Sequence, residues 1–257
     1  MNRCVGIILL VILGSCARGA DKSPQAAAVP SPGLPWKLAD GSCWEGLSYA
    51  LTASDNPEAD NVFTKVSQRG ARKPLVPYPM GATPLAIRVE LIYQATKTRE
   101  TTQWTNAKTT ETWAYDGFFL EENPIDGSVT VTDPRLHADL IQGMLESPFT
   151  ELSWMSPEFY QGIRQVQEKS YYLYRSGSLA SRSLPFTPPM AQGKMAWIDS
   201  KTGFPFASVD HDSLWLYHQV SSTSDALVLP SAFQDALKEA KARYQHLIGR
   251  YQSVVKP

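Results

Sequence analysis

The sequence has little cysteine and none of the common catalytic or cofactor-binding motifs. Its 257 residues include only three cysteines, Cys4, Cys16 and Cys43, and no two of them form a CxxC pair. A glycine-rich phosphate loop, an HExxH pair and a Gly-x-Ser-x-Gly nucleophile turn are also absent. We therefore expect no cofactor, no metal centre and a protein that is not an enzyme.

An excess of charge of either sign is also missing. The chain has 24 Lys and Arg against 25 Asp and Glu, a net charge of -1, which does not favour a nucleic-acid partner. Asp210-His211-Asp212, with His218 nearby, is the one cluster that could suggest a metal site. Adjacent strand residues point to opposite faces, and aspartates flanking a turn are expected from turn chemistry alone, so we favour a turn.

Long hydrophobic runs are absent except at the N-terminus. After Arg3, the segment Cys4 to Leu13 is apolar apart from Gly6. It is too short to span a bilayer, which takes roughly 20 apolar residues, and its layout is that of a secretory signal. An ordinary signal cut near Gly19 or Ala20 is one interpretation.

The end of this run, Leu13-Gly14-Ser15-Cys16, resembles the lipobox of bacterial lipoproteins. The resemblance implies that Cys16 becomes the acylated first residue of the mature chain, which leaves Cys43 without a partner for an internal disulfide. Under either interpretation the protein is exported from the cytoplasm. Because Pro24, Pro30, Pro32 and Pro35 follow, we expect a signal peptide over 1–15, a lipid-anchored Pro/Ala-rich tether over 16–40 and a folded domain over 41–257.

The folded part is predicted to be α+β. With 43% hydrophobic residues it can bury a sizeable core. We expect a mainly helical segment from Ser42 to Gly70, a proline-rich loop from Arg72 to Pro84, and a half-buried strand from Leu85 to Tyr93. The threonine-rich segment from Thr96 to Thr112 suits exposed strands with a turn near Asn106.

Further elements follow along the chain. A short helix is predicted from Leu136 to Glu146, and a longer one begins at Ser231 with Phe233, Leu237, Ala240, Tyr244, Leu247 and Tyr251 on one stripe. Between them, alternating patterns predict two strands within Tyr160 to Arg175, and three more at Lys194 to Asp199, Pro205 to Val209 and Ser213 to Val220. Together these segments predict a sheet of roughly eight or more antiparallel strands with a few helices.

One segment, Ala196 to Pro205, has a recognisable pattern. After Ala196 its sequence is Trp197-Ile198-Asp199-Ser200-Lys201-Thr202-Gly203-Phe204-Pro205. This pattern resembles the W-I-D-x-x-T-G-x-P hairpin of the LolA/LolB-like periplasmic lipoprotein-carrier superfamily. The resemblance extends loosely over Tyr160 to Phe233. It implies a curved antiparallel sheet that forms an unclosed half-barrel, with helices covering its open side and a cavity for acyl chains. It also implies the periplasmic face of a bacterial membrane, and we expect the outer membrane. The hairpin itself is architectural: Asp199 can accept amide hydrogen bonds and Gly203 can adopt the positive φ of the turn.

The candidate ligand site comes from the strand pattern. Leu85, Ile87, Val89 and Leu91 alternate and are expected to share one inward face, while Trp215 and Tyr217 share one face of a strand whose other face carries Leu214 and Leu216. The predicted ligand-binding residues are therefore Leu85, Ile87, Val89, Leu91, Trp113, Tyr115, Trp215 and Tyr217.

We expect an exported, lipid-anchored, non-enzymatic protein that binds an acyl chain or another apolar ligand. One alternative is an envelope structural or interaction module with a packed interior. Another is a hydrolase in which carboxylates among Asp116, Glu121, Glu122 and Asp126 face each other across a cleft.

Overall fold

The computed structural model describes residues 38–59, 61–94, 97–132, 149–152, 154–177, 193–223 and 225–255. All of them belong to one of two compact units of the chain, Ser31–Pro257. The predicted signal peptide, Cys16, nearly all of the tether and the predicted helix at Leu136 to Glu146 lie outside the described residues. Within the described part, no helix combines the length and apolar character needed to cross a bilayer.

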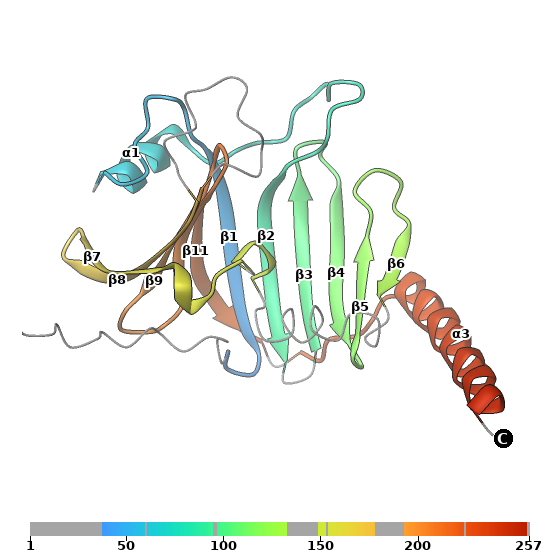
Figure 1. Ribbon diagram of the computed structural model, residues 1–257. Coiled ribbons are helices and arrows are strands. Elements are labelled where there is room, and N and C mark those ends of the chain that lie inside the picture. The colour runs from blue at the N-terminus through green and yellow to red at the C-terminus, as the bar shows by residue number, and fades with distance from the viewer. Residues whose placement is uncertain are drawn as a thin grey trace, which may run out of the picture. The chain divides into compact units, whose positions relative to one another are not determined.

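One eleven-stranded antiparallel sheet forms the core of this unit (Figure 1). The strands are β1 (Ser42–Ala50), β2 (Ala86–Gln94), β3 (Lys97–Trp104), β4 (Thr109–Tyr115), β5 (Phe118–Glu122), β6 (Val129–Thr132), β7 (Tyr160–Val166), β8 (Lys169–Ser176), β9 (Lys194–Asp199), β10 (Pro205–Asp210) and β11 (Ser213–Ser222). The helices are α1 (Val62–Arg69) and α3 (Ser231–Val255), with short 3-10 turns η1 (Thr150–Leu152) and η2 (Pro157–Phe159).

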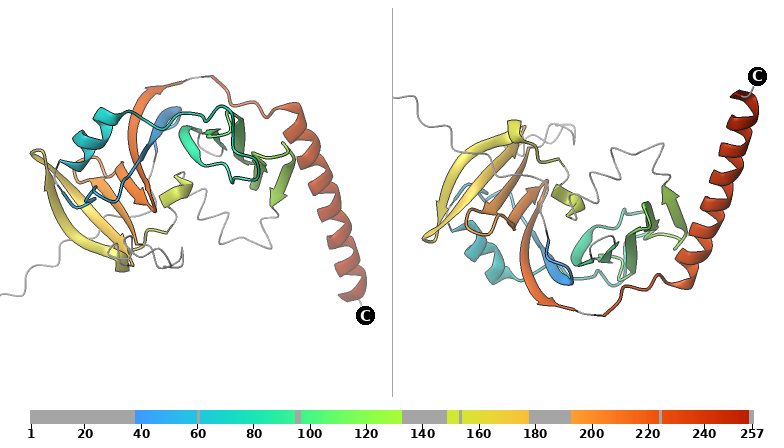
Figure 2. Two further views of the ribbon diagram at one scale, coloured as in Figure 1. Left: turned by 90° about the horizontal axis from the view of Figure 1, so that it is seen from above. Right: turned by 90° about the horizontal axis from the view of Figure 1, so that it is seen from below.

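The strand order is β6-β5-β4-β3-β2-β1-β11-β10-β9-β8-β7. Strands β6 and β7 are the two edges, so the sheet is curved but unclosed, as expected (Figure 2). Strand β1 pairs with both β2 and β11, which joins the two halves of the chain at the centre of the sheet. This pairing brings Gly46 beside both Val89 and Tyr217.

The expectation of a mainly helical segment from Ser42 to Gly70 is wrong over its first part, where β1 lies. Alternate residues of β1 are buried on one face: Ser42, Trp44, Gly46 and Ser48. Three of these four are small or polar, so the hydrophobic alternation that marks a strand is missing from the sequence. Only α1, which buries Val62, Phe63 and Val66, is helical as predicted.

The two faces of the sheet have separate cores. We call the face that carries Trp44, Val89, Trp215 and Tyr217 the inner face; its cluster also contains Phe149, Leu152 and Met155 from the segment around η1. On the outer face, α1 packs over β9, β10 and β11, where it meets Trp197, Val209 and Leu214. At the other end of the outer face, α3 packs over β4 and β5 through Phe233 and Leu237, against Trp113 and Leu120. Strand β11 is therefore covered on both faces.

The β9–β10 hairpin has the predicted geometry. The Asp199 carboxylate accepts the backbone N–H groups of Lys201 and Thr202 at 2.8 and 2.9 Å. Gly203 has φ +75°, and Pro205 begins the returning strand. The turn between β10 and β11 is also confirmed, because Asp210 ends one strand and the next begins at Ser213.

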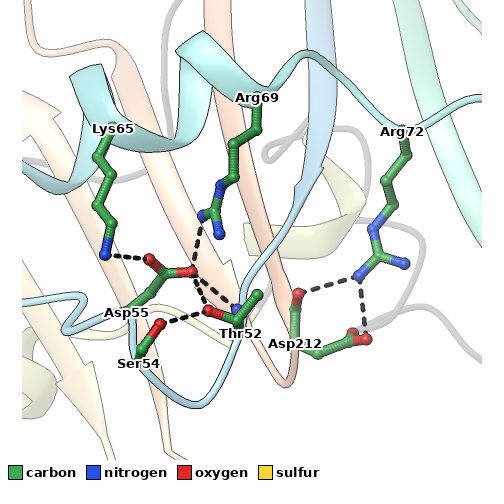
Figure 3. Close-up of polar contacts among 7 residues, drawn as sticks. All are labelled: Thr52, Ser54, Asp55, Lys65, Arg69, Arg72 and Asp212. Carbon is green, nitrogen blue, oxygen red and sulfur yellow. Dashed lines mark hydrogen bonds and ion pairs between the residues drawn. The ribbon is translucent and has the colours of Figure 1, made fainter.

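A buried carboxylate joins the end of β1 to α1 (Figure 3). The Asp55 side chain has no solvent exposure and accepts from the Thr52 backbone N–H and hydroxyl, at 2.8 and 2.9 Å. It also contacts the Arg69 guanidinium at 2.7 Å and the Lys65 ammonium at 3.1 Å. Burial raises the pKa of Asp55, but these hydrogen bonds outweigh it and hold the pKa well below its usual range.

Candidate functional site

A cavity of about 230 Å³ lies on the inner face over β2 to β5, beside β11. Its apolar lining is formed by Ala86, Val89, Trp104, Phe119 and Trp215. Its polar lining has three threonine hydroxyls and four carboxylates: Thr102, Thr110, Thr112, Glu100, Glu121, Glu122 and Glu151. The cavity is therefore amphipathic, with aromatic walls beside acidic and hydroxyl groups.

The strand register explains this lining. Val89 pairs with Thr102, and Thr102 pairs with Thr110, so these three residues form one row across the inner face. A second row runs from Glu100 to Thr112 and on to Glu121. Because residues paired across strands share a face, each row aligns its side chains toward the same side of the sheet.

The threonines of β3 and β4 correct the prediction that this segment is exposed. Thr98, Thr102 and Thr110 are buried. Thr110 accepts a hydrogen bond from the Trp104 indole N–H at 2.7 Å, and the Thr102 hydroxyl donates to Glu100 at 3.2 Å. A hydroxyl can be buried at small cost when it is hydrogen-bonded, so a threonine-rich strand need not be solvent-exposed.

Next to the cavity, the inner face is packed. Phe149 meets the ring of Trp44 edge-on at 5.6 Å between centroids, and meets Tyr217 at the same distance. The Tyr217 hydroxyl lies 2.8 Å from that of Ser208. Burial raises the pKa of Tyr217 well above its usual value, and the negative charge of Glu151 raises it further, so this phenol stays protonated. The hollow part of the inner face is thus over β2 to β5 rather than over β1 and β9 to β11.

The eight predicted ligand residues do not converge on one space. Val89 and Trp215 line the cavity. Leu91 and Tyr217 share its face but border a separate space of only about 10 Å³, room for about one water molecule. Ile87 is buried at a register shift of β2.

Leu85 is not part of the inward row that the sequence predicted. It precedes β2, and 46% of its surface is exposed. The register of β2 shifts between Ala86 and Arg88, so the alternation does not continue unbroken to Leu85.

Trp113 and Tyr115 lie on the outer face. Trp113 is 1% exposed within the cluster that α3 covers, and Tyr115 packs against the same cluster. Their indole and phenol rings therefore face α3 and not the cavity.

The four carboxylates of the hydrolase alternative are also separated. Glu121 and Glu122 line the cavity, but Asp116 lies in the β4–β5 turn and pairs with Lys241. Asp126 lies in the β5–β6 turn, where the backbone N–H and hydroxyl of Ser128 lower its pKa. Among the described residues, no group of three or more His, Cys, Asp or Glu side chains is arranged to hold a metal ion.

Sequence reasoning missed Glu100, Thr102, Thr110 and Thr112, which supply much of the polar lining. The signal that could have found them is their spacing of two within β3 and within β4, which places each pair on one face. Glu151 carried no such signal, because it comes from the 3-10 turn η1.

No family model and no curated protein matches the sequence. The solved structures that match in architecture include two mycobacterial proteins. The Mycobacterium tuberculosis lipoprotein LppX has a TM-score of 0.32 and 7% identity, over 73% of this chain and 88% of that one. LprF from Mycobacterium bovis has a TM-score of 0.29 and 8% identity, over 74% of this chain and 89% of that one. Similarity at this level is too distant to transfer a ligand or a function.

Proposed function

We propose that this chain is a non-enzymatic binding protein of the bacterial cell envelope that holds the apolar end of an amphipathic ligand, such as an acyl chain, in the inner-face cavity. The observation that carries the proposal is the lining of the cavity. In it, Val89, Phe119 and Trp215 lie beside the threonine and glutamate side chains of the two cross-strand rows described above. Apolar surface holds an apolar group by excluding water, and the polar groups fix its orientation.

The size of the cavity limits the ligand. Sites for whole drug-sized ligands usually measure about 300–1,000 Å³. At about 230 Å³ this cavity holds one segment of a chain, and the remainder of the ligand extends outside it. The bound group is therefore one end of a molecule.

A pair of matched substitutions tests the cavity. Thr112→Trp places an indole in the cavity, whereas Thr101→Trp makes the same change on the outer face, since Thr101 alternates with Thr102 along β3. In a fluorescent fatty-acid displacement assay, Thr112→Trp is expected to weaken binding at least about tenfold, and Thr101→Trp to leave it unchanged. Circular dichroism checks that both variants fold. Equal effects of the two variants, or no binding by the unmodified chain, would contradict the proposal.

We further propose that Cys16 is acylated and that residues 16–40 tether the domain to the membrane, by the interpretation of the N-terminal sequence given above. Cys16→Ala is expected to move the protein from the membrane fraction to the soluble fraction and to remove labelling by a fatty-acid probe. Unchanged labelling in the variant would refute the anchor but would leave the cavity proposal untouched.

A structural or interaction module remains the second candidate because one observation favours it. Phe149, Leu152 and Met155 fill the inner face next to the cavity, as they would in a packed core. Native mass spectrometry of the protein released from membranes separates the two candidates, since only a carrier is expected to co-purify with a lipid.

A further inference from the structure

A second open space lies on the outer face, between α3 and β4. This groove has a volume of about 460 Å³, twice that of the inner cavity, and within the usual range for ligand sites. Its apolar surface comes from Tyr115, Leu229, Leu237 and Ala242. It is separated from the inner cavity by the sheet itself, because Trp113 and Leu120 of the outer cluster lie beneath α3.

The groove is open because α3 continues past the sheet. The helix contacts β5 and β6, and Figure 1 shows its C-terminal half running beyond the edge at β6. Leu229 and Leu237 are 3% and 6% exposed, so they form the floor, while Val228 at the rim is 72% exposed. Apolar residues thus extend from the buried core to the groove surface.

Two ammonium groups line this groove, and a third lies beside it. Lys238 and Lys241 line the groove one turn apart on α3, and Lys97 lies over the Tyr115 ring, 4.6 Å from its centroid. Lys241 pairs with Asp116, and Lys238 contacts no carboxylate among the residues described here. Both charged side chains that line the groove, Lys238 and Lys241, are positive, which favours an anionic group beside them.

We propose that the groove is a second ligand site, for a single-chain anionic amphiphile such as a fatty acid. The chain lies against Leu229, Leu237 and Ala242, and the anionic head is held by the ammonium groups of Lys238 and Lys241. An isolated molecule fits these observations better than a bilayer surface does, because the apolar residues line a groove whose floor is buried. The site does not depend on the inner cavity or on acylation of Cys16.

The first test fills the groove. Binding of monomeric dodecanoate, below its micelle concentration, is measured by titration calorimetry on the full chain. Ala242→Trp is expected to weaken binding at least about tenfold, whereas Ala232→Trp, at an exposed position of the same helix outside the groove, leaves it unchanged. Because the inner cavity is also proposed to take an acyl chain, all of these variants are compared in the Thr112→Trp background, in which the inner cavity is filled, and the binding that remains is expected to be that of the groove. If Thr112→Trp alone abolishes dodecanoate binding, dodecanoate occupies the inner cavity and the groove proposal is wrong, while the proposed function survives.

The second test asks whether charge selects the ligand. Lys238→Gln is expected to weaken dodecanoate binding by roughly three- to tenfold without affecting dodecan-1-ol, and Arg243→Gln, which removes the same charge outside the groove, changes neither. In the Thr112→Trp background, where the glutamate-lined inner cavity is filled, dodecylamine is expected to bind more weakly than dodecanoate. Equal affinity for the amine and the acid would overturn the proposal, as would binding only to anionic vesicles and not to the monomer.

Discussion

The buried carboxylate of Asp55 gives the sharpest test of the packing of α1 against the sheet. In Asp55→Asn the side chain keeps an oxygen that can accept from Thr52 but loses its charge, and with it the attraction to Arg69 and Lys65. Breaking a fully buried ion pair costs about 3–5 kcal/mol. Since the Arg69 and Lys65 side chains are 36% and 51% exposed and can be hydrated, we expect a loss of about 2–3 kcal/mol in the free energy of unfolding at pH 7.

The loss is expected to depend on pH. The pKa of Asp55 is lowered in the folded state relative to about 3.9 in an unfolded chain. A group of this kind contributes stability that is fully present above the unfolded pKa and is lost as the pH falls toward the folded pKa. The stability difference between the unmodified protein and Asp55→Asn should therefore be constant from about pH 8 to pH 5 and should shrink below about pH 4.

Urea unfolding followed by tryptophan fluorescence measures this difference, and a loss of 2–3 kcal/mol lowers the midpoint by about 1 M. Asp212→Asn is the matched control (Figure 3). The Asp212 carboxylate also pairs with an arginine, Arg72, at 3.0 Å, but its side chain is 65% exposed, so the expected loss is about 0.2–1 kcal/mol. Equal losses in the two variants, or a difference that persists unchanged at pH 3, would refute the reasoning.

Two glycines give further predictions. Gly203→Val is expected to lower the free energy of unfolding by about 1 kcal/mol or more. The cause is the positive φ alone, since no neighbouring atom lies within 4 Å of the added Cβ. An unchanged thermal midpoint would contradict this, and ligand affinity should not change while the variant is folded. Gly46→Val is expected to cost about 1–3 kcal/mol, because its Cβ would lie 3.1 Å from the ring of Tyr217. A crystal structure of Gly46→Val in which the Tyr217 ring has not moved would show that this contact is not the cause.

Much of the sheet could be predicted where apolar residues alternate with a period of two. The strands around the hairpin at Gly203 were found in this way, because Trp197, Val209 and Leu214 supply the buried side of each one. Strand β1 was missed because its inner-face positions are Ser42, Trp44, Gly46 and Ser48, which do not read as a hydrophobic face. Gly46 is small because the Tyr217 ring lies directly over it, a contact between distant parts of the chain that no local pattern can reveal.

The candidate site was harder to predict, since alternation shows which residues share a face but not which face surrounds a cavity. In β4, Trp113 and Tyr115 are the large apolar residues and were assigned to the ligand, yet they face α3. The other face of β4 carries Thr110 and Thr112, which line the cavity. When the aromatic face of a strand packs under a helix, its polar face is the one that lines the cavity. The hydrophobic residues of β4 therefore indicated the wrong face for the site.

Strand pairing resolves this ambiguity once one reference residue is placed. Val89 was assigned correctly to the inner face, and its pairing with Thr102, followed by that of Thr102 with Thr110, carries the assignment across two more strands. The same step from Leu91 reaches Glu100, Thr112 and then Glu121. The polarity of the cavity thus follows from the register between strands and not from any strand taken alone. For that reason a ligand for this site should be sought among amphipathic molecules, because a purely apolar chain would leave the threonine and glutamate rows without the polar contacts that they offer.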